Sequence, residues 1–408
     1  MPGIVIVGAG HAAVQLVTSL RQDGYDGDLT IIGDEPHLPY QRPPLSKTYM
    51  KHGEAERLLL KAESFFETNR ITLLAGTRVV AIDREARQAI TAPGTHIDYD
   101  HLVLATGAQN VRPPLTGAHH PAILELRTLA HAEAIRARLA RTGKAIVIGG
   151  GFIGLEFAAM AAGEGVSSTI VEAGPRLMAR AVSPLISDSF LDYHRSLGNE
   201  VLLDAPASEI VGTREDLIES VRLADGRVLS GDLVLLAAGV RPNTDLAEQA
   251  GIACRNGILV DGRLATDDPR ISAIGDCASV LTIDGIHQRL ESVQAATDQA
   301  RHLSRRLAKG DEAGGYHAVP WFWSDQGELK LQIAGLASDA DGFEDRRGAG
   351  TARTIVGFRG DHLVSVETIN AAGDHMAARR LLALPQPLTR QRLSDSAYDL
   401  RALAKSQG

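Results

Sequence analysis

The stretch IVIVGAGHAAVQLVTSL, residues 4–20, decides the fold of this 408-residue chain. A short apolar, β-branched run precedes a glycine cluster, and an apolar segment with helical spacing follows it. Residues 29–35, LTIIGDE, then read as a second strand that ends in acidic residues. Strand, glycine turn, helix and strand make a βαβ unit, and such continuous apolar runs are typical of parallel strands buried on both faces.

The same arrangement occurs a second time. Residues 145–161 read AIVIGGGFIGLEFAAMA, and residues 168–173, STIVEA, again end a strand in acid. Further strand-like runs end at Gly107, Asn243 and Cys277. The internal repeat predicts an α/β protein with two similar domains.

The length and a change of character near residue 319 predict a third domain. A chain of 408 residues is too long for one compact core. A helix expected at about 291–309 is followed by a glycine-rich linker at 309–315 and then by patterns of a small sheet with helices. We therefore predict two Rossmann-like dinucleotide-binding domains and a smaller α+β C-terminal domain. Their bounds are 1–110 with 240–318, 111–239, and 319–408.

The first glycine cluster has the spacing of a dinucleotide-binding turn. In the cluster from Gly8 to Ala13, Gly8 permits the tight turn, Gly10 lets the backbone approach a pyrophosphate, and a small third residue permits close packing of helix on strand. The phosphates would lie at the positive helix N-terminus. Asp34 and Glu35 follow Gly8 by 26 and 27 positions, where an acid binds ribose hydroxyls.

The second cluster is a complete G-x-G-x-x-G motif formed by Gly149, Gly151 and Gly154. Glu172 lies 23 positions after Gly149, at the end of the next strand. A carboxylate there accepts the ribose hydroxyls and repels a 2′-phosphate, so NADH is favoured over NADPH. Arg176 could soften that preference, and a purely structural Glu172 stays an alternative.

Composition excludes several classes of function. The formal net charge of −8 argues against general nucleic-acid binding. No run approaches the roughly 18 apolar residues of a membrane span, and the apolar N-terminus lacks the basic region of a signal peptide. Cys254 and Cys277 stand 23 positions apart, and none of the 14 histidines has a metal-binding spacing. We expect a cytoplasmic protein with no metal, no dithiol centre and no membrane or nucleic-acid partner.

Several longer motifs resemble one family of flavoproteins. They are GDEPHLPYQRPPLSK at 33–47, LATGA at 104–108, AAGVRPNTDLA at 237–247, TDDPRISAIGDCA at 266–278 and VPWFWSDQ at 319–326. Together they resemble the FAD-dependent NADH:ferredoxin reductases, the putidaredoxin-reductase-like enzymes of cytochrome P450 and ring-hydroxylating dioxygenase systems. The resemblance covers essentially the whole chain and implies a glutathione-reductase-like fold.

The resemblance also implies two cofactors, FAD and NADH, and a [2Fe–2S] ferredoxin as partner of a monomer or weak homodimer. The residues it assigns to FAD are Gly8, Gly10, Ala12, Asp34, Glu35, Arg42, Pro43, Lys47, Val80, Arg127, Asp276, Val293 and Trp321. Those assigned to NAD are Gly149, Gly151, Ile153, Gly154, Glu156 and Glu172.

Lys47 and Glu156 are the candidate catalytic residues. An ammonium beside flavin N5 would stabilise the negative charge that develops as the flavin takes hydride. In the resembled family the matching glutamate lies near the nicotinamide carboxamide, so we hypothesise a Lys47–Glu156 ion pair. The alternatives are a solvated surface lysine and a glutamate placed in a helix's first turns by the macrodipole.

Two further groups of residues have both a functional and a structural interpretation. Trp321 and Trp323 alternate on a strand and would share one face, so one of them flanks the flavin or both belong to the core. Arg301, Arg305 and Lys309 recur at spacing four and form a basic stripe, with Arg306 adjacent. The stripe would steer an acidic ferredoxin or would simply be a solvated face.

The flavin-contacting segment at 33–47 contains no cysteine. This argues against disulfide reductases and against NADH oxidases and peroxidases, which need a cysteine there. The expected function is transfer of electrons from NADH through FAD to a ferredoxin. The alternatives are another acceptor, such as rubredoxin or a small molecule, and a redox sensor like the apoptosis-inducing-factor group. The sequence names neither the ferredoxin nor the oxygenase.

Overall fold

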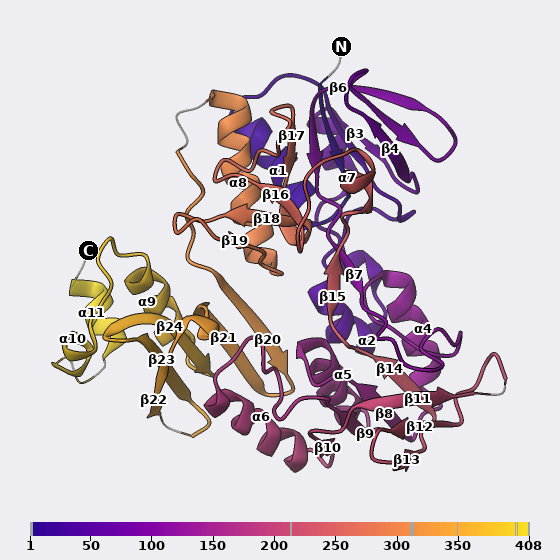
Figure 1. Cartoon of the computed structure of the whole chain (residues 1–408), viewed down its shortest axis with the longest axis vertical. Coiled ribbons are helices and arrows are strands. Elements are labelled where there is room, and N and C mark those ends of the chain that lie inside the picture. Colours follow the sequence, from indigo (N-terminus) through magenta and orange to yellow (C-terminus); the bar gives the residue numbers. More distant parts are fainter. Residues whose placement is uncertain are drawn as a thin grey trace. The chain divides into compact units, whose positions relative to one another are not determined.

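The computed structural model describes residues 3–212, 214–310, 314–348, 350–395, 397 and 399–406. The chain forms two compact units (Figure 1). Unit 1 contains Met1–Gln41, Ala55–Gln109 and Val240–Ala318, and unit 2 contains Arg42–Glu54, Asn110–Gly239 and Val319–Gly408. Of the expected linker at 309–315, residues 311–313 lie outside the described residues.

Unit 1 is built on a seven-stranded sheet in the order β3-β2-β1-β6-β5-β4, with β17 also paired to β6. The four strands β3, β2, β1 and β6 are parallel neighbours, whereas β5 and β4 continue the sheet antiparallel. The strands are β1 (Gly3–Val7), β2 (Leu29–Ile32), β3 (Ile71–Leu74), β4 (Val79–Asp83), β5 (Gln88–Thr91), β6 (His96–Leu104) and β17 (Ile271–Ala273).

Two helices, α1 (His11–Gln22) and α8 (Val293–Lys309), pack against each other beside this sheet. The core between them and the strands is aliphatic, and Ile6, Leu16 and Leu303 are fully buried. The remaining elements of unit 1 are short. They are η2 (Ala55–Leu58), α3 (Glu63–Thr68), β7 (Ala108–Asn110), β15 (Val240–Pro242), α7 (Asp245–Gln249), β16 (Ile258–Val260), η3 (Gly275–Cys277), β18 (Ala278–Leu281) and β19 (His287–Gln288).

Unit 2 contains a second parallel sheet, in the order β10-β9-β8-β14. Its strands are β8 (Lys144–Ile148), β9 (Ser167–Val171), β10 (Glu200–Leu202) and β14 (Leu233–Leu236), and the three-stranded sheet beside it is formed by β11 (Ala207–Val211), β12 (Ser220–Leu223) and β13 (Val228–Leu229). Helix α5 (Phe152–Gly163) follows β8 and is buried from Gly154 to Ala161. The other elements of this part are η1 (Pro43–Ser46), α2 (Thr48–His52), α4 (Leu129–Leu139) and α6 (Pro184–Ser196).

The C-terminal part of unit 2 is a five-stranded antiparallel sheet in the order β20-β21-β24-β23-β22. Its strands are β20 (Trp321–Gln326), β21 (Leu329–Gly335), β22 (Gly342–Arg347), β23 (Arg353–Arg359) and β24 (His362–Ile369), with η5 (Ala337–Asp339), α9 (Ala372–Leu382), α10 (Arg390–Asp395) and α11 (Leu400–Ser406). One face of the sheet packs on α9 through Val356, Val366 and Ala378. The predicted α/β class with an additional α+β segment is confirmed.

Both cysteines carry thiols that ionise with difficulty. Cys277 is fully buried, and burial raises the pKa of its thiol. Cys254 is half-buried, and burial, with the nearby Glu248, raises the pKa of its thiol to about 11. Neither cysteine forms a disulfide.

The described residues lack two features, a membrane-spanning helix and a metal-binding cluster. None of the helices there is long and apolar enough to cross a membrane. The same residues contain no cluster of three or more histidine, cysteine or acidic side chains that could hold a metal ion.

Candidate functional site

The first glycine turn connects β1 to α1. It leaves open space beside its backbone, where a ligand could approach the N-terminus of α1. Gly8 has φ +112°, and a Cβ on it would lie 2.1 Å from the carbonyl oxygen of Ala105. Gly10 has no atom within 4 Å of the position of an added Cβ. The turn therefore needs glycine at Gly8 for its conformation and at Gly10 for access to the α1 N-terminus.

Residues distant in sequence surround this turn within unit 1. A Cβ on Gly275 would lie 3.3 Å from the Cβ of Ala12 and 3.8 Å from that of Ala296. The loop that contains Asp276 therefore lies between the beginning of α1 and the beginning of α8, where Val293 lies. The structure thus brings together the first glycine turn and two other regions predicted to contact FAD.

The acids after β2 differ in their surroundings. Asp34 is exposed and pairs with Arg78, with 3.2 Å between Nη2 and Oδ2. Glu35 is half-buried and accepts a hydrogen bond from the hydroxyl of Tyr40. Both carboxylates lie directly after the strand, as the motif predicts.

The second glycine turn connects β8 to α5 in unit 2 and repeats this geometry. Gly149 has φ +114°, and a Cβ on it would lie 2.3 Å from the carbonyl oxygen of Ala237. Gly151, like Gly10, has no atom within 4 Å of an added Cβ. A Cβ on Gly154 would lie 2.3 Å from the carbonyl oxygen of Gly149, so this position excludes even alanine.

Glu172 holds the second turn in place. Its Oε2 accepts from the backbone N–H of Gly150 at 2.7 Å, and its Oε1 accepts from that of Gly174 at 2.8 Å. A carboxylate has about four acceptor positions, so both oxygens keep capacity for ribose hydroxyls. The sequence did not reveal this bracing role.

Arg176, which was expected to soften a preference for NADH, is engaged elsewhere. Its guanidinium donates to the carbonyl oxygens of Ala179 and Val182 and to the hydroxyl of Ser187, at 2.6, 2.7 and 2.9 Å. These bonds hold the side chain against the segment before α6 and its first turns. Recruiting Arg176 to a 2′-phosphate would break them.

Two exposed apolar side chains mark surfaces suited to a planar cofactor. Val80 and Ile153 are both 42% exposed, although most large apolar side chains of the chain are buried. They belong to the residues predicted for FAD and NAD, respectively. Open space at Gly10 and Gly151 together with these apolar surfaces fits FAD and a nicotinamide dinucleotide.

Lys47 and Glu156 form the predicted ion pair inside unit 2, with 3.1 Å between Lys47 Nζ and Glu156 Oε1. Lys47 lies between η1 and α2, and Glu156 projects from the buried segment of α5. Glu156 is only 5% exposed. Burial raises the pKa of its carboxyl, while Lys47 and two serine hydroxyls act in the opposite direction. The role of the pair in hydride transfer stays a prediction.

Three polar partners of this pair were missed in the sequence. The Ser46 hydroxyl donates to Glu156 Oε2 at 2.5 Å, and the Ser324 hydroxyl donates to Oε1 at 2.7 Å. The carboxylate of Asp325 lies 3.6 Å from Lys47 Nζ. Ser46 precedes Lys47, and Ser324 and Asp325 follow the tryptophans, so all three lie in motifs already noted. Nothing in those motifs tells that these side chains face the ion pair.

The remaining predicted FAD residues of unit 2 lie near the beginning of the lysine segment. Arg42 Nη1 donates to the backbone carbonyl of Arg127 at 2.8 Å, which joins two predicted contacts. Pro43 is the first residue of η1 and helps to set the direction of the chain toward Lys47.

The tryptophans of β20 lie on one face of the strand, as alternation predicts. Their ring centroids are 5.8 Å apart. Trp321 packs against α9, where the His375 ring is 5.3 Å away and the Arg379 guanidinium lies 4.1 Å from the Trp321 ring centroid. Both rings are half-buried. The contacts of Trp321 with α9 give it a packing role.

The three residues of the predicted basic stripe on α8 are all exposed, and two of them pair with acids. Arg301 and Arg305 are exposed, with Arg301 Nη1 3.4 Å from Asp298. Lys309 pairs with Asp23 at 3.0 Å. Arg306 lies off the stripe and donates to the Ser272 hydroxyl.

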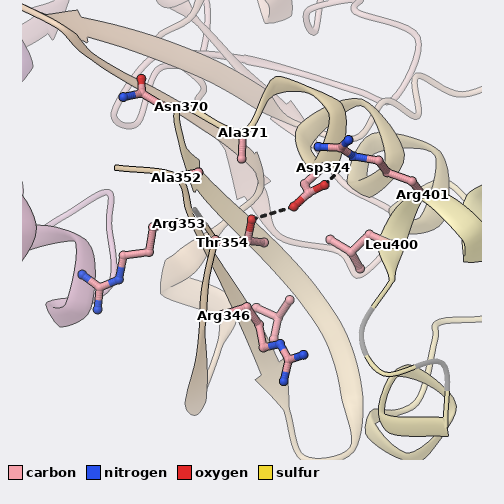
Figure 2. Close-up of a pocket in the computed structure, with 11 residues that line it drawn as sticks. Arg346, Ala352, Arg353, Thr354, Asn370, Ala371, Asp374, Leu400 and Arg401 are labelled. Atoms are coloured by element: carbon pink, nitrogen blue, oxygen red, sulfur yellow. Dashed lines mark hydrogen bonds and ion pairs between the residues drawn. The ribbon is translucent and has the colours of Figure 1, made fainter. Parts of the chain in front are cut away.

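A pocket of about 340 Å³ lies in the C-terminal part of unit 2. Figure 2 shows Asp374 bonded to Thr354, while Arg346, Arg353 and Arg401 point in different directions. Asp374 also pairs with Arg401 at 2.7 Å, and Arg353 pairs with Asp345 at 2.8 Å. The charged side chains that line the pocket have partners and do not point toward a common centre, so the pocket is not a candidate site.

Comparison with known proteins identifies the family. Residues 2–300 match the family described as pyridine nucleotide-disulphide oxidoreductase, and residues 321–404 match the reductase C-terminal domain. The chain belongs to the pyridine nucleotide-disulphide oxidoreductase family. This membership confirms the resemblance predicted from the motifs and makes the protein an oxidoreductase that uses FAD and NAD(P)H.

Individual members of the family match almost the whole chain. Rhodocoxin reductase of Rhodococcus erythropolis is 43% identical over 98% of this chain and 93% of its own length. A solved ferredoxin reductase for the CYP199A2 system of Rhodopseudomonas palustris is 44% identical, covers 99% of this chain and 100% of its own, and has a TM-score of 0.94. The covalent putidaredoxin reductase–putidaredoxin complex is 33% identical, with a TM-score of 0.93 and 99% of both chains covered.

Within this oxidoreductase the predicted site residues divide between the two units. Unit 1 contains Gly8, Gly10, Ala12, Asp34, Glu35, Val80, Asp276 and Val293. Unit 2 contains Arg42, Pro43, Lys47, Arg127, Trp321 and all the predicted NAD residues. The ion pair of the candidate catalytic residues therefore forms entirely within unit 2.

Proposed function

We propose that this oxidoreductase carries electrons from NADH through FAD to a [2Fe–2S] ferredoxin that serves a cytochrome P450 or a ring-hydroxylating dioxygenase. The single observation that supports it best is the likeness, over nearly the whole chain, to reductases named for ferredoxin partners. Each NADH would reduce two ferredoxins and release one proton. The protein's own part is to bind, orient and tune the cofactors.

FAD binding would rest on the first glycine turn and on Asp34 or Glu35 for the adenosine ribose. Asp276 would accept from ribityl hydroxyls, because a carboxylate is a strong acceptor. Val80, which is 42% exposed, would add an apolar contact with the cofactor. The backbone at Val293 and the segment from Arg42 to Lys47, with Arg127, would complete the contacts.

NADH would bind at the second glycine turn, with Ile153 against the dinucleotide and Glu172 on its ribose. The carboxylate favours free hydroxyls over a 2′-phosphate. Arg176 does not offset this preference, because three acceptors already hold its guanidinium. We therefore propose NADH as the donor.

Lys47 and Glu156 would form the polar part of the hydride-transfer site. When bound, the two cofactors supply hydride transfer and then release of single electrons. Lys47 provides a fixed positive charge that needs no reorganisation during the reaction, and Glu156 keeps the ammonium in position. Exclusion of water strengthens both effects, and Glu156 is buried.

The ferredoxin would approach the exposed arginines Arg301 and Arg305 of α8. Both residues are exposed, as is Lys309, which also pairs with Asp23. We expect Arg305→Glu to raise the KM for ferredoxin about five-fold at low salt, and to lose that effect at 1 M salt. An equal effect at both salt concentrations would contradict electrostatic docking, and Lys309→Glu provides the comparison.

Stopped-flow absorbance tests the proposed function. FAD-loaded protein is mixed anaerobically with NADH and then with a [2Fe–2S] ferredoxin. Rapid bleaching of the flavin absorbance, followed by ferredoxin-dependent reoxidation, is the expected result. Flavin that stays reduced when ferredoxin arrives would indicate another acceptor or a redox sensor.

Three further features belong to this proposal. Residues 1–110 with 240–318 would form the FAD-binding domain, 111–239 the NAD-binding domain, and 319–408 a C-terminal domain that covers the flavin. The protein would be a monomer or weak homodimer in the cytoplasm. Sedimentation velocity of the FAD-loaded protein and fractionation of cells check the two latter points.

A further inference from the structure

The edge strand β20 places two polar side chains against the Lys47–Glu156 pair. Ser324 is fully buried and donates to Glu156 Oε1, the same oxygen that Lys47 approaches. Asp325, the next residue, brings its carboxylate to 3.6 Å from Lys47 Nζ. Both come from the C-terminal segment, about 170 residues beyond Glu156 in the sequence.

The orientation of the Ser324 hydroxyl is fixed by its own neighbours. Gln326 Nε2 donates to Ser324 Oγ at 3.3 Å, and Gln326 Oε1 lies 2.9 Å from Nε2 of the buried His194. Because the amide occupies an acceptor position of the hydroxyl, the hydroxyl proton is directed toward Glu156. The bond is therefore held by a buried polar chain that extends into α6.

Both oxygens of Glu156 receive a hydroxyl donor. Ser46 donates to Oε2 and Ser324 to Oε1, and Lys47 adds its charge on the Oε1 side. Burial favours the protonated form, whereas these three donors favour the carboxylate. Removal of either hydroxyl shifts the balance toward protonation.

Asp325 changes the charge of the cluster. Glu156 and Lys47 alone would sum to zero, and the second carboxylate makes the three residues −1. Asp325 is 39% exposed, so its influence is partly screened, but it acts directly on the ammonium. A net negative cluster stabilises a nearby positive charge.

We propose that Ser324 and Asp325 are positioning residues: Ser324 keeps Glu156 ionised, and Asp325 gives the Lys47–Glu156 cluster a net negative charge that favours the cationic nicotinamide ring of NAD+ over the neutral ring of NADH. This inference rests on the proposed function, because it assumes that the nicotinamide binds beside the pair. The C-terminal segment then contributes to nicotinamide selectivity as well as to packing.

The first test compares Asp325→Asn with Glu328→Gln in FAD-loaded protein. Both variants remove one negative charge from the same hairpin, and Glu328 is exposed and away from the pair. Equilibrium dialysis gives the Kd for NAD+ and for 1,4,5,6-tetrahydro-NAD, an analogue whose nicotinamide ring is uncharged and cannot donate hydride. Asp325→Asn is expected to raise the Kd for NAD+ about five-fold and to leave that of the analogue unchanged. Asp325→Glu is expected to restore the wild-type ratio.

The second test follows the pH dependence of flavin reduction by NADH in Ser324→Ala. Lys47 is the charged group that faces Glu156. Asp325 acts on Glu156 indirectly, through its contact with Lys47. Loss of one hydroxyl donor is expected to move the acidic limb of the profile up by about one pH unit. Ser46→Ala removes the donor on the other oxygen and is expected to give the same shift. The test can therefore be made with either variant if the other folds poorly.

The outcomes separate the two proposals. If the wild-type protein binds FAD and is bleached by NADH, the proposed function stands. An Asp325→Asn variant that then behaves like Glu328→Gln, with serine variants that keep the wild-type pH profile, would overturn the inference alone. Wild-type protein that NADH does not reduce would overturn both.

Discussion

The two βαβ motifs have nearly the same backbone but support it differently. At the first position of each turn, φ is +112° in Gly8 and +114° in Gly149. At the last position, five residues after the first glycine, the motifs diverge: the first has Ala13, which is fully buried, whereas a Cβ on Gly154 would lie 2.3 Å from the carbonyl oxygen of Gly149. The first motif therefore accommodates a methyl group at a position where the second cannot. The glycine pattern thus records where neighbouring backbone comes too near for a Cβ.

The buried acids of the two units also differ. In unit 1, burial alone would raise the pKa of Asp268, but hydrogen bonds from Arg270 and Arg84 lower it. In unit 2, burial raises the pKa of Glu156, and it raises that of Glu367 to about 7. Glu367 Oε1 accepts from the backbone N–H of Ser183 at 2.9 Å, while Oε2 has no partner among the described residues. Unit 2 therefore holds two acids with a raised pKa, whereas Asp268 of unit 1 has a lowered one.

The largest effect should come from Gly154→Ala. Its Cβ would clash with backbone that cannot move without opening the turn, so we expect a loss of about 4 kcal/mol in unfolding free energy. Ala13→Gly, the reverse change at the matching position of the first motif, should cost about 1 kcal/mol. Denaturant unfolding of both variants measures the difference. Similar losses in the two variants would show that the motifs are supported alike.

A smaller effect, dependent on pH, is expected for Glu367→Gln. The folded pKa of Glu367 is above its unfolded value, so the stability this group gives is present below the unfolded pKa and is lost as pH rises through about 7. The variant should therefore unfold like the wild type near pH 4 and be stabilised by about 3 kcal/mol at pH 8.

Asp268→Asn should behave in the opposite way. Its folded pKa is lowered, so the stability it gives is present above the unfolded pKa and is lost as pH falls through the folded value. The variant should be destabilised at neutral pH. Thermal unfolding across pH measures both variants, and parallel pH curves for Glu367→Gln and the wild type would refute the assignment.

The smallest effect is expected at the second glycine of each turn. Nothing lies within 4 Å of an added Cβ at Gly10 or Gly151, so alanine should leave the unfolding free energy unchanged. A methyl group there would obstruct the pyrophosphate. We expect Gly151→Ala to weaken NAD+ binding about ten-fold without affecting FAD content, and Gly10→Ala to do the reverse. Loss of both cofactors in one variant would contradict separate sites.

Sequence patterns predicted the features that local chemistry specifies. The apolar runs, glycine turns and terminal acids gave both βαβ units, and family motifs gave the Lys47–Glu156 pair. The support of Glu156 by Ser324 could not be derived, because no periodicity tells which hydroxyl of a strand faces a helix far away in the chain. The pairing of Lys309 with Asp23 could not be derived for a similar reason, since it depends on how α8 packs on α1.

The low reactivity of the two native thiols makes site-specific labelling of the protein practical. Thiol reagents attack the thiolate, and the raised pKa values of Cys254 and Cys277 leave very little of it at neutral pH. A cysteine introduced at an exposed position, such as that of Arg301, would react with maleimide far faster than either native thiol. Fluorescent or spin labels could thus be attached to the introduced cysteine while Cys254 and Cys277 stay in place. Movements during turnover could then be followed without first replacing the native cysteines.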